Sequence, residues 1–287
     1  VFKENGWTPP TTIPELNALA DEMMAKGIVP FGSGNSGWRP ANEWQVSIAL
    51  NSIAGPDNVQ KALTGQIPWT SQPFVEAINE LDSWWDKGYF GPDYFSLNGE
   101  QVMANLAEGT AAMSPTGSWN FGRVPEYFNG RQDEVGFVGF PSGEGVPYPI
   151  FSLGIGSTFS ISAAAQNPEG AAKVIDQVFS EEFYTDINNV WQGEWNMPLR
   201  NLSGVSLNED VIPLYTESMA ALASAVNENQ YGYTTWTFMP PATNSYVVSG
   251  IEEVWLDILS TEDFLAEMDK IFQQELAEGK VADIPAR

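Results

Sequence analysis

The sequence predicts a mixed α and β fold in which helices dominate. Six segments have the pattern of helices, three of them next to capping or stop signals, whereas only two short segments have the pattern of strands. In addition, 43% of the 287 residues are hydrophobic, which is enough to build one large core or two smaller ones. The chain is therefore expected to be globular.

The first two predicted helices have the sharpest signals. In residues 11–27, Thr12 and Glu15 have the spacing of a capping box at the start of an apolar stripe. In residues 71–88, apolar side chains again repeat at helical spacing, and Gly88 ends the pattern. Each helix is expected to bury one face.

Four later segments complete the helical prediction. A helix is expected from Pro168 to Ser180, with Asn167 as its cap. The other three are apolar stripes at helical spacing: Tyr215 to Val226, Val247 to Ile258, and Phe264 to Glu275. Aromatic residues within such stripes, for example Trp255, are expected to be core residues.

Strands are predicted only near the middle of the chain. Residues 134–141 and 157–163 alternate or run apolar between Gly and Pro. Loops rich in Gly, Asn, Pro and aromatic residues are predicted at 29–44, 141–157, 191–204 and 229–246.

The charge and the missing residue types exclude several classes of function. With 37 acidic and 12 basic residues the net charge is -25, which disfavours nucleic acid and anionic lipid as partners. The sequence has no Cys and no His, so thiol and imidazole catalysis, structural zinc and haem are excluded. It also has no P-loop and no calcium-binding loop. No catalytic residue, metal or cofactor is predicted.

The sequence contains no segment that would insert into a membrane. No stretch approaches about 18 consecutive apolar residues, and residues 1–10 lack the pattern of a signal peptide. Taken as given, the sequence predicts a soluble chain without an export signal.

Aromatic residues gather in the predicted loops, beside amide and carboxylate side chains such as Asn42, Glu43 and Asn244. They are Trp38, Trp44, Trp119, Trp191, Trp195, Tyr231, Tyr233, Trp236 and Tyr246. Ring faces stack on the C–H faces of sugars, and neighbouring polar groups pair with the hydroxyls. For any one of these residues, packing beneath a loop is an equally good explanation. As a group, they favour a site for a neutral polyol.

Five segments occur in the order found in a known family, at residues 2–31, 95–121, 134–145, 157–182 and 193–201. Together they resemble the extracellular solute-binding proteins of ABC importers, in the sugar-binding family 1, maltose-binding-protein-like group. The resemblance implies an α/β fold of the type II periplasmic-binding-protein class. In that fold two lobes are joined by a hinge and close around a ligand.

The resemblance also implies a domain organisation dominated by the helix-rich C-terminal lobe. Residues 1–134 would form its first part, 135–188 the hinge strands and a remnant of the N-terminal lobe, and 189–287 its second part. Family members carry a signal peptide and further βα units before the point where this sequence begins, so an N-terminally truncated form is expected. Strands of the remnant would lack sheet neighbours. The remnant is therefore expected to be rearranged or covered by another chain.

The resemblance nominates the residues of the ligand site. Trp119, after an expected turn at 115–117, matches a Trp that stacks on sugar. Looser matches before the predicted helices at 44–54 and from residue 247 add further candidates: Trp38, Arg39, Trp44, Trp236, Asn244 and Tyr246. The guanidinium of Arg39 suits vicinal hydroxyls, although a surface ion pair remains the alternative.

The implied function is binding of a carbohydrate, preferably an oligosaccharide, and its delivery to ABC permease subunits by hinge closure. The location would be the periplasm or the outer face of the cell membrane, with a lipoprotein as one form of the parent protein. Two alternatives stay open. One is a glycoside hydrolase, which would need two carboxylates about 5–10 Å apart. The other is a receptor for a different solute, such as a polyamine.

Overall fold

The computed structural model describes residues 1–37, 40–156, 158–193 and 205–284. The chain divides into two compact units. Unit 1 comprises Val1–Pro115, Val138–Gly154 and Asn229–Arg287, and unit 2 comprises Thr116–Phe137 and Ile155–Glu228. In the part of the chain that is described, no helix has the length and apolar character needed to cross a membrane.

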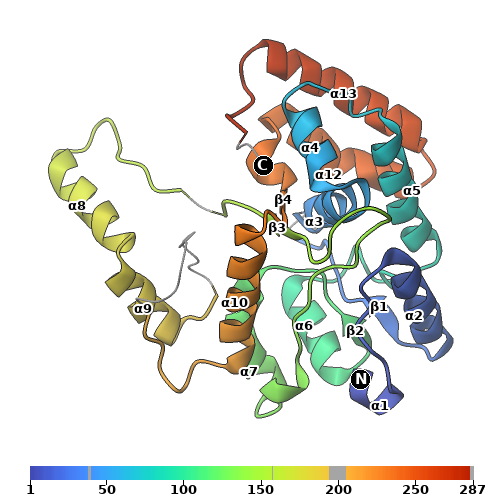
Figure 1. Ribbon diagram of the computed structural model, residues 1–287, viewed down its shortest axis with the longest axis horizontal. Helices are drawn as coiled ribbons and strands as arrows, with labels where there is room; N and C mark the ends of the chain where they lie inside the picture. The colour runs from blue at the N-terminus through green and yellow to red at the C-terminus, as the bar shows by residue number, and fades with distance from the viewer. Residues whose placement is uncertain (38–39, 157, 194–204, 285–287) are drawn as a thin grey trace. The chain divides into compact units, whose positions relative to one another are not determined.

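Of the elements in the described residues, unit 1 contains most of the helices and all four strands (Figure 1). Its α-helices are α1 (Phe2–Asn5), α2 (Ile13–Ala25), α3 (Pro40–Ala49), α4 (Pro56–Leu63), α5 (Gln72–Asp86), α6 (Gly99–Glu108), α11 (Thr235–Phe238), α12 (Pro241–Trp255) and α13 (Thr261–Ala277). Its strands are β1 (Val29–Phe31), β2 (Ala111–Met113), β3 (Phe151–Leu153) and β4 (Tyr231–Tyr233). A π-helical turn, Leu50–Ala54, continues α3.

Local sequence accounts for the start of α2. Glu15 N–H donates to Thr12 Oγ1 at 3.4 Å, and Thr12 N–H donates to Glu15 Oε2 at 3.1 Å, which completes the predicted capping box. The helix buries the apolar face that begins with Ile13 and Leu16. The helices predicted within residues 71–88, 215–226, 247–258 and 264–275 are also confirmed, as α5, α10, α12 and α13, although α12 already ends at Trp255.

The strands form two small parallel sheets. Strand β1 pairs with β2, with Val29 opposite Ala111, and β3 pairs with β4, with Phe151 opposite Tyr231. Each strand has only three residues, so helix packing supplies most of the core.

Both strand predictions were wrong. Residues 132–134 form a 3₁₀ turn, Phe140 makes only an isolated bridge to Ile150, and residues 158–163 have no strand. An apolar pattern becomes a strand only where another strand pairs with its backbone, and none does so here within the described residues. The predicted loops at 29–44, 141–157 and 229–246 instead contain β1, β3 and β4.

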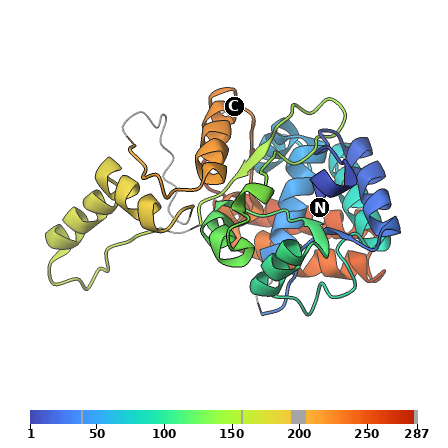
Figure 2. The ribbon, with the colours of Figure 1, turned by 90° about the horizontal axis from the view of Figure 1, so that it is seen from below.

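The core of unit 1 joins helices from opposite ends of the chain. Figures 1 and 2 show the orange and red helices α12 and α13 beside the blue α3 and the teal α5, and these helices are in contact. Trp255 of α12 stacks on Trp85 of α5, with ring centroids 4.8 Å apart and planes 9° apart. Trp255 is buried in the core, as its helical spacing predicts, whereas Trp85 is partly buried and packs against the core.

Unit 2 is built around a small aromatic core. It contains a 3₁₀ helix (Ser118–Arg123), α7 (Val124–Phe128), α8 (Pro168–Val178), α9 (Glu181–Val190) and α10 (Pro213–Asn227). The buried Tyr184 and Tyr215 hydroxyls lie 3.0 Å apart. At the start of α8, Asn167 accepts the Gly170 N–H at 2.9 Å, which confirms the predicted cap.

Asp82 of α5 supplies a first stability prediction. Burial, together with the nearby negative charges of Asp86 and Asp257, raises the pKa of Asp82 to about 6. A raised carboxyl pKa lowers folded-state stability increasingly as pH rises from about 4 through the folded value. Because Asp82 is partly exposed, Asp82→Asn should raise the melting temperature by only about 1–2 °C at pH 8. The gain should disappear at pH 4.

Circular dichroism melting at both pH values tests this prediction. Asp93→Asn, which removes a charge from an exposed position, is the matched control and should show no such pH-dependent gain. A gain for Asp82→Asn that is equal at pH 4 and pH 8 would contradict the proposed ionisation.

Candidate functional site

Three of the predicted site residues lie on helices that contact one another in unit 1. Trp44 is on α3, Trp236 on α11 and Asn244 on α12, and each of these helices packs against the other two. All three side chains are partly exposed. The region that carries Trp44, Trp236 and Asn244 is called the α3–α11–α12 site below.

A buried amide fixes the chain that leads into α11. Asn51 Oδ1 accepts the Tyr233 N–H at 2.8 Å, and Asn51 Nδ2 donates to Tyr233 O at 2.9 Å and to Ser47 O at 2.7 Å. Two residues further on, Ser47 Oγ accepts the Thr235 N–H at 3.0 Å. The end of β4 is therefore tied to α3, and Trp236 starts from a fixed backbone.

Gly154 allows the Trp236 indole to lie close to the backbone that follows β3. A Cβ added at Gly154 would come within 2.8 Å of Trp236 Cζ2 and 2.9 Å of Thr234 Oγ1. These separations are shorter than normal contacts, so only glycine fits without movement here. One edge of the indole is thus held by the backbone that follows β3.

A second polar network fixes the beginning of α3 to α12. The fully buried Asn42 donates to Val248 O at 2.7 Å and to Glu252 Oε1 at 2.8 Å, and accepts the Tyr94 hydroxyl at 2.7 Å. Asn35 also donates to Glu252 Oε1, at 2.8 Å. Because Asn42 is held on several sides, the residue that follows it, Glu43, starts from a rigid position.

Glu43 and Asn244 meet at the surface of this region. Asn244 Nδ2 donates to Glu43 Oε1 at 2.6 Å. Burial raises the pKa of Glu43, and the hydrogen bond from Asn244 only partly offsets that effect. Glu43 was not among the predicted site residues, since a single acidic residue in so acidic a sequence gives no distinguishing signal.

Tyr246 lies on another face of α12. Successive helical residues are turned by about 100°, so Asn244 and Tyr246 point about 200° apart. The Tyr246 ring stacks on Phe264 of α13, with centroids 5.7 Å apart and planes 20° apart. The structure therefore does not bring Tyr246 together with Trp44, Trp236 and Asn244.

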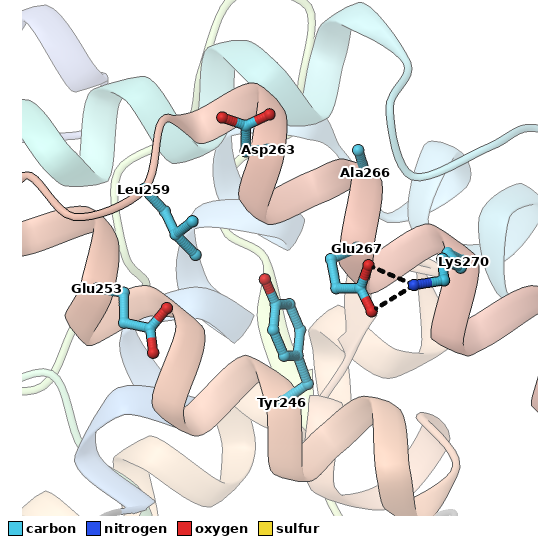
Figure 3. Close-up of a pocket in the computed structure, with 7 residues that line it drawn as sticks. All are labelled: Tyr246, Glu253, Leu259, Asp263, Ala266, Glu267 and Lys270. Carbon is cyan, nitrogen blue, oxygen red and sulfur yellow. Dashed lines mark hydrogen bonds and ion pairs between the residues drawn. The ribbon is translucent and has the colours of Figure 1, made fainter.

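Figure 3 shows the groove that Tyr246 lines between α12 and α13, with a volume of about 530 Å³. The other lining residues are Glu253, Leu259, Asp263, Ala266, Glu267 and Lys270. Burial raises the pKa of Tyr246, and the surrounding carboxylates act in the same direction. Lys270 pairs with Glu267 at 2.8 Å, so the groove has an excess of negative charge.

Trp119 belongs to unit 2. It lies in the 3₁₀ helix Ser118–Arg123, and its six-membered ring occupies the place that a Cβ on Gly117 would take. Residues 115–117 are not the expected turn, because Gly117 is fully extended, with φ -120° and ψ -179°. Trp38 and Arg39 lie outside the described residues.

The described carboxylates do not gather into a metal site. No group of three or more acidic side chains in residues 1–37, 40–156, 158–193 and 205–284 could hold a metal ion. Among the described residues, the α3–α11–α12 site offers indole faces, the Asn244 amide and the Glu43 carboxylate.

Comparison with known proteins gives one family match. A family model described as "Bacterial extracellular solute-binding protein" matches residues 1–184. An uncharacterised ABC transporter extracellular-binding protein of Pyrococcus horikoshii is 26% identical over 194 residues, which are 66% of this chain and 41% of that protein. A diacetylchitobiose-binding protein of Streptomyces coelicolor is 23% identical over 63% of this chain and 39% of that protein. The chain thus spans about two fifths of the length of these two relatives.

Among solved structures, a chitin oligosaccharide-binding protein has a similar fold. The TM-score is 0.78 at 20% sequence identity, over 97% of this chain and 68% of that one. At this identity the likeness establishes the fold and not the ligand.

Proposed function

Because this chain belongs to the family of bacterial extracellular solute-binding proteins, we propose that it binds a carbohydrate outside the cytoplasm for an ABC importer. The family match over residues 1–184 is the observation that carries this proposal. The chain also has the α/β fold of the type II periplasmic sugar-binding proteins. The diacetylchitobiose- and chitin-oligosaccharide-binding relatives favour an oligosaccharide as the ligand.

The α3–α11–α12 site supplies the groups that a neutral sugar needs. The indoles of Trp44 and Trp236 offer apolar faces for sugar C–H groups, and Asn244 and Glu43 offer polar groups for hydroxyls. Trp119, which belongs to unit 2, is proposed separately as a residue that stacks on sugar. No catalytic step is assigned, since the family and its relatives are transport proteins.

We also propose how the lobes of the protein and the permease subunits of the importer take part in transport. Residues 1–134 and 189–287 are assigned to the C-terminal lobe, and 135–188 to the hinge strands and part of the N-terminal lobe. In this proposal hinge closure around the sugar creates the surface that permease subunits recognise. The protein acts outside the cell membrane, either free or anchored by lipid.

Titration calorimetry of the chain against a panel tests the ligand class. The panel contains N,N′-diacetylchitobiose, raffinose, xylotriose and, for the alternative solute class, spermidine. Saturable binding of a sugar that chromatography recovers intact is the expected result. Recovery of a shortened sugar would show that the protein is a hydrolase. Binding of spermidine and of no sugar would show that the ligand is a polyamine and not a carbohydrate.

Trp236→Ala should weaken binding of the panel sugar by about 10- to 100-fold. Removing an indole that covers a sugar face forfeits about 1.5–3 kcal/mol of apolar burial. Calorimetry of the variant measures the loss. Trp7→Ala is the matched control, because Trp7 is a partly exposed indole that donates to Glu22 at 2.8 Å, away from these helices. Equal affinities of the wild type and Trp236→Ala would remove Trp236 from the site.

A further inference from the structure

We infer that Glu43 binds the hydroxyl groups of the sugar directly and that Asn244 is its positioning residue. In this arrangement one carboxylate oxygen is held by the Asn244 amide, and the other accepts hydrogen bonds from the ligand. The inference rests on the proposed function and adds to it the residue that selects the ligand's hydroxyl pattern.

The first observation is that no cation among the described residues compensates the charge of Glu43. Glu43 is partly buried, and within the described residues Asn244 is its only hydrogen-bond partner, and no Lys or Arg forms an ion pair with it. Removing a carboxylate from water without a cation or several donors is unfavourable. Such a group is more often kept for binding than for stability.

The second observation is that the side-chain oxygen of Asn244 is buried without a hydrogen-bond donor in the described part of the chain. A carboxylate can only accept, so the Asn244 amide must turn its Nδ2 toward Glu43. This orientation leaves Asn244 Oδ1 buried, and no donor in the described part of the chain reaches it. A buried acceptor without a partner costs about 1–3 kcal/mol. The Asn244 amide therefore donates to Glu43 even though this orientation leaves its own oxygen without a hydrogen bond.

A purely structural role of Glu43 does not account for its burial or for its contact with Asn244. Glu43 lies in the first turn of α3, where a negative charge stabilises the helix dipole. That effect needs neither burial nor a neighbouring amide. Glu100 also lies in the first turn of its helix, α6, where it is exposed, and provides the comparison.

The chemistry of the pair defines the ligand groups that it selects. An ionised carboxylate accepts without donating, and hydrogen bonds to a charged oxygen are stronger than neutral ones. A sugar that places a free hydroxyl at Glu43 satisfies the remaining oxygen. A sugar in which that hydroxyl is absent, methylated or inverted leaves the carboxylate desolvated and unpaired, and is rejected.

The test uses calorimetry of the chain with N,N′-diacetylchitobiose, raffinose and xylotriose. For each sugar that binds the wild type, Glu43→Gln should raise Kd by about 10- to 100-fold. Glu100→Gln should leave Kd within twofold. Both variants are melted in parallel, and the Glu43→Gln melting temperature should stay close to that of the wild type.

A double variant tests the positioning role. In Asn244→Asp alone two carboxylates face each other, and sugar binding should fall further than in Glu43→Gln. When Glu43→Gln is combined with Asn244→Asp, the amide stands at position 43 and the carboxylate at position 244. The amide can again donate to the carboxylate, so the hydrogen bond is restored in the opposite direction. The combination should bind better than Asn244→Asp alone.

The outcomes separate this inference from the proposed function. If a sugar binds but Glu43→Gln changes its Kd by less than twofold, the inference fails and the proposed function stands. If none of the three sugars binds the wild type, both fail. If the double variant shows no recovery over Asn244→Asp, Asn244 is not a positioning residue.

Discussion

Replacing Glu275 by alanine is expected to lower the free energy of unfolding by about 3 kcal/mol. Glu275 of α13 is only 4% exposed and accepts hydrogen bonds from Ala242 N at 3.1 Å, Thr243 N at 2.8 Å and Thr243 Oγ1 at 2.9 Å. Helix α12 begins with Pro241, and its N-cap, Pro240, has no side chain that can accept. The carboxylate of another helix therefore performs the capping, and its removal leaves buried donors without a partner.

The pH dependence of this effect follows from the same contacts. Burial alone would raise the pKa of Glu275, but the hydrogen bonds from Thr243 and Ala242 outweigh it, so the net pKa is lowered. A lowered carboxyl pKa adds stability above the unfolded value, about 4.3, and this stability is lost as pH falls through the folded value. The difference between wild type and Glu275→Ala should therefore shrink below about pH 4.

Urea unfolding at pH 7 and at pH 3.5 measures both effects. Glu267→Ala is the control on the same helix, because Glu267 forms an exposed pair with Lys270 and should change stability by less than about 1 kcal/mol. A Glu275→Ala effect no larger than that of Glu267→Ala would show that water caps α12 equally well.

Asn51→Ala is the second substitution with a large expected effect, again about 3 kcal/mol. It removes the three hydrogen bonds to Tyr233 and Ser47 and leaves the Tyr233 N–H and C=O buried without these partners. It also opens space beside Gly232, whose missing Cβ lets Asn51 approach the strand. Since β4 leads into α11, the variant should also bind the panel sugar less tightly.

Unfolding in urea and calorimetry with the panel sugar test the two consequences. Asn58→Ala is the matched control, because the partly exposed Asn58 amide donates to a single carbonyl, Ala54 O, at 2.7 Å. Its expected cost is about 1 kcal/mol. If Asn51→Ala costs no more than this control, the polar tie between α3 and β4 is not important for stability.

The helices could be predicted from sequence because their signals are local. A capping box such as Thr12 and Glu15 uses two residues of the same turn, and an apolar stripe needs only a few turns to show its period. The strands could not, because each depends on a distant partner: β1 pairs with a strand about 80 residues later, and so does β3. A short run such as Val29–Phe31 has no period of its own to recognise.

The candidate site was only partly predictable for the same reason. Aromatic residues in Gly- and Pro-rich segments marked Trp44 and Trp236, which do lie on helices in contact. The sequence could not reveal that Tyr246 faces Phe264, or that Glu43 meets a side chain about 200 residues away. Such contacts depend on how the helices pack and not on local spacing.

The division of unit 1 into three chain segments has a consequence for biosynthesis. Val247, Ile251 and Phe264 belong to the same core as Val46 and Trp84 but lie in the last sixty residues of the chain. While those residues are still on the ribosome, the apolar faces of α3 and α5 remain uncovered. Unit 1 cannot complete its core before α12 and α13 have left the ribosome, so the uncovered apolar faces of α3 and α5 stay accessible to chaperones until then.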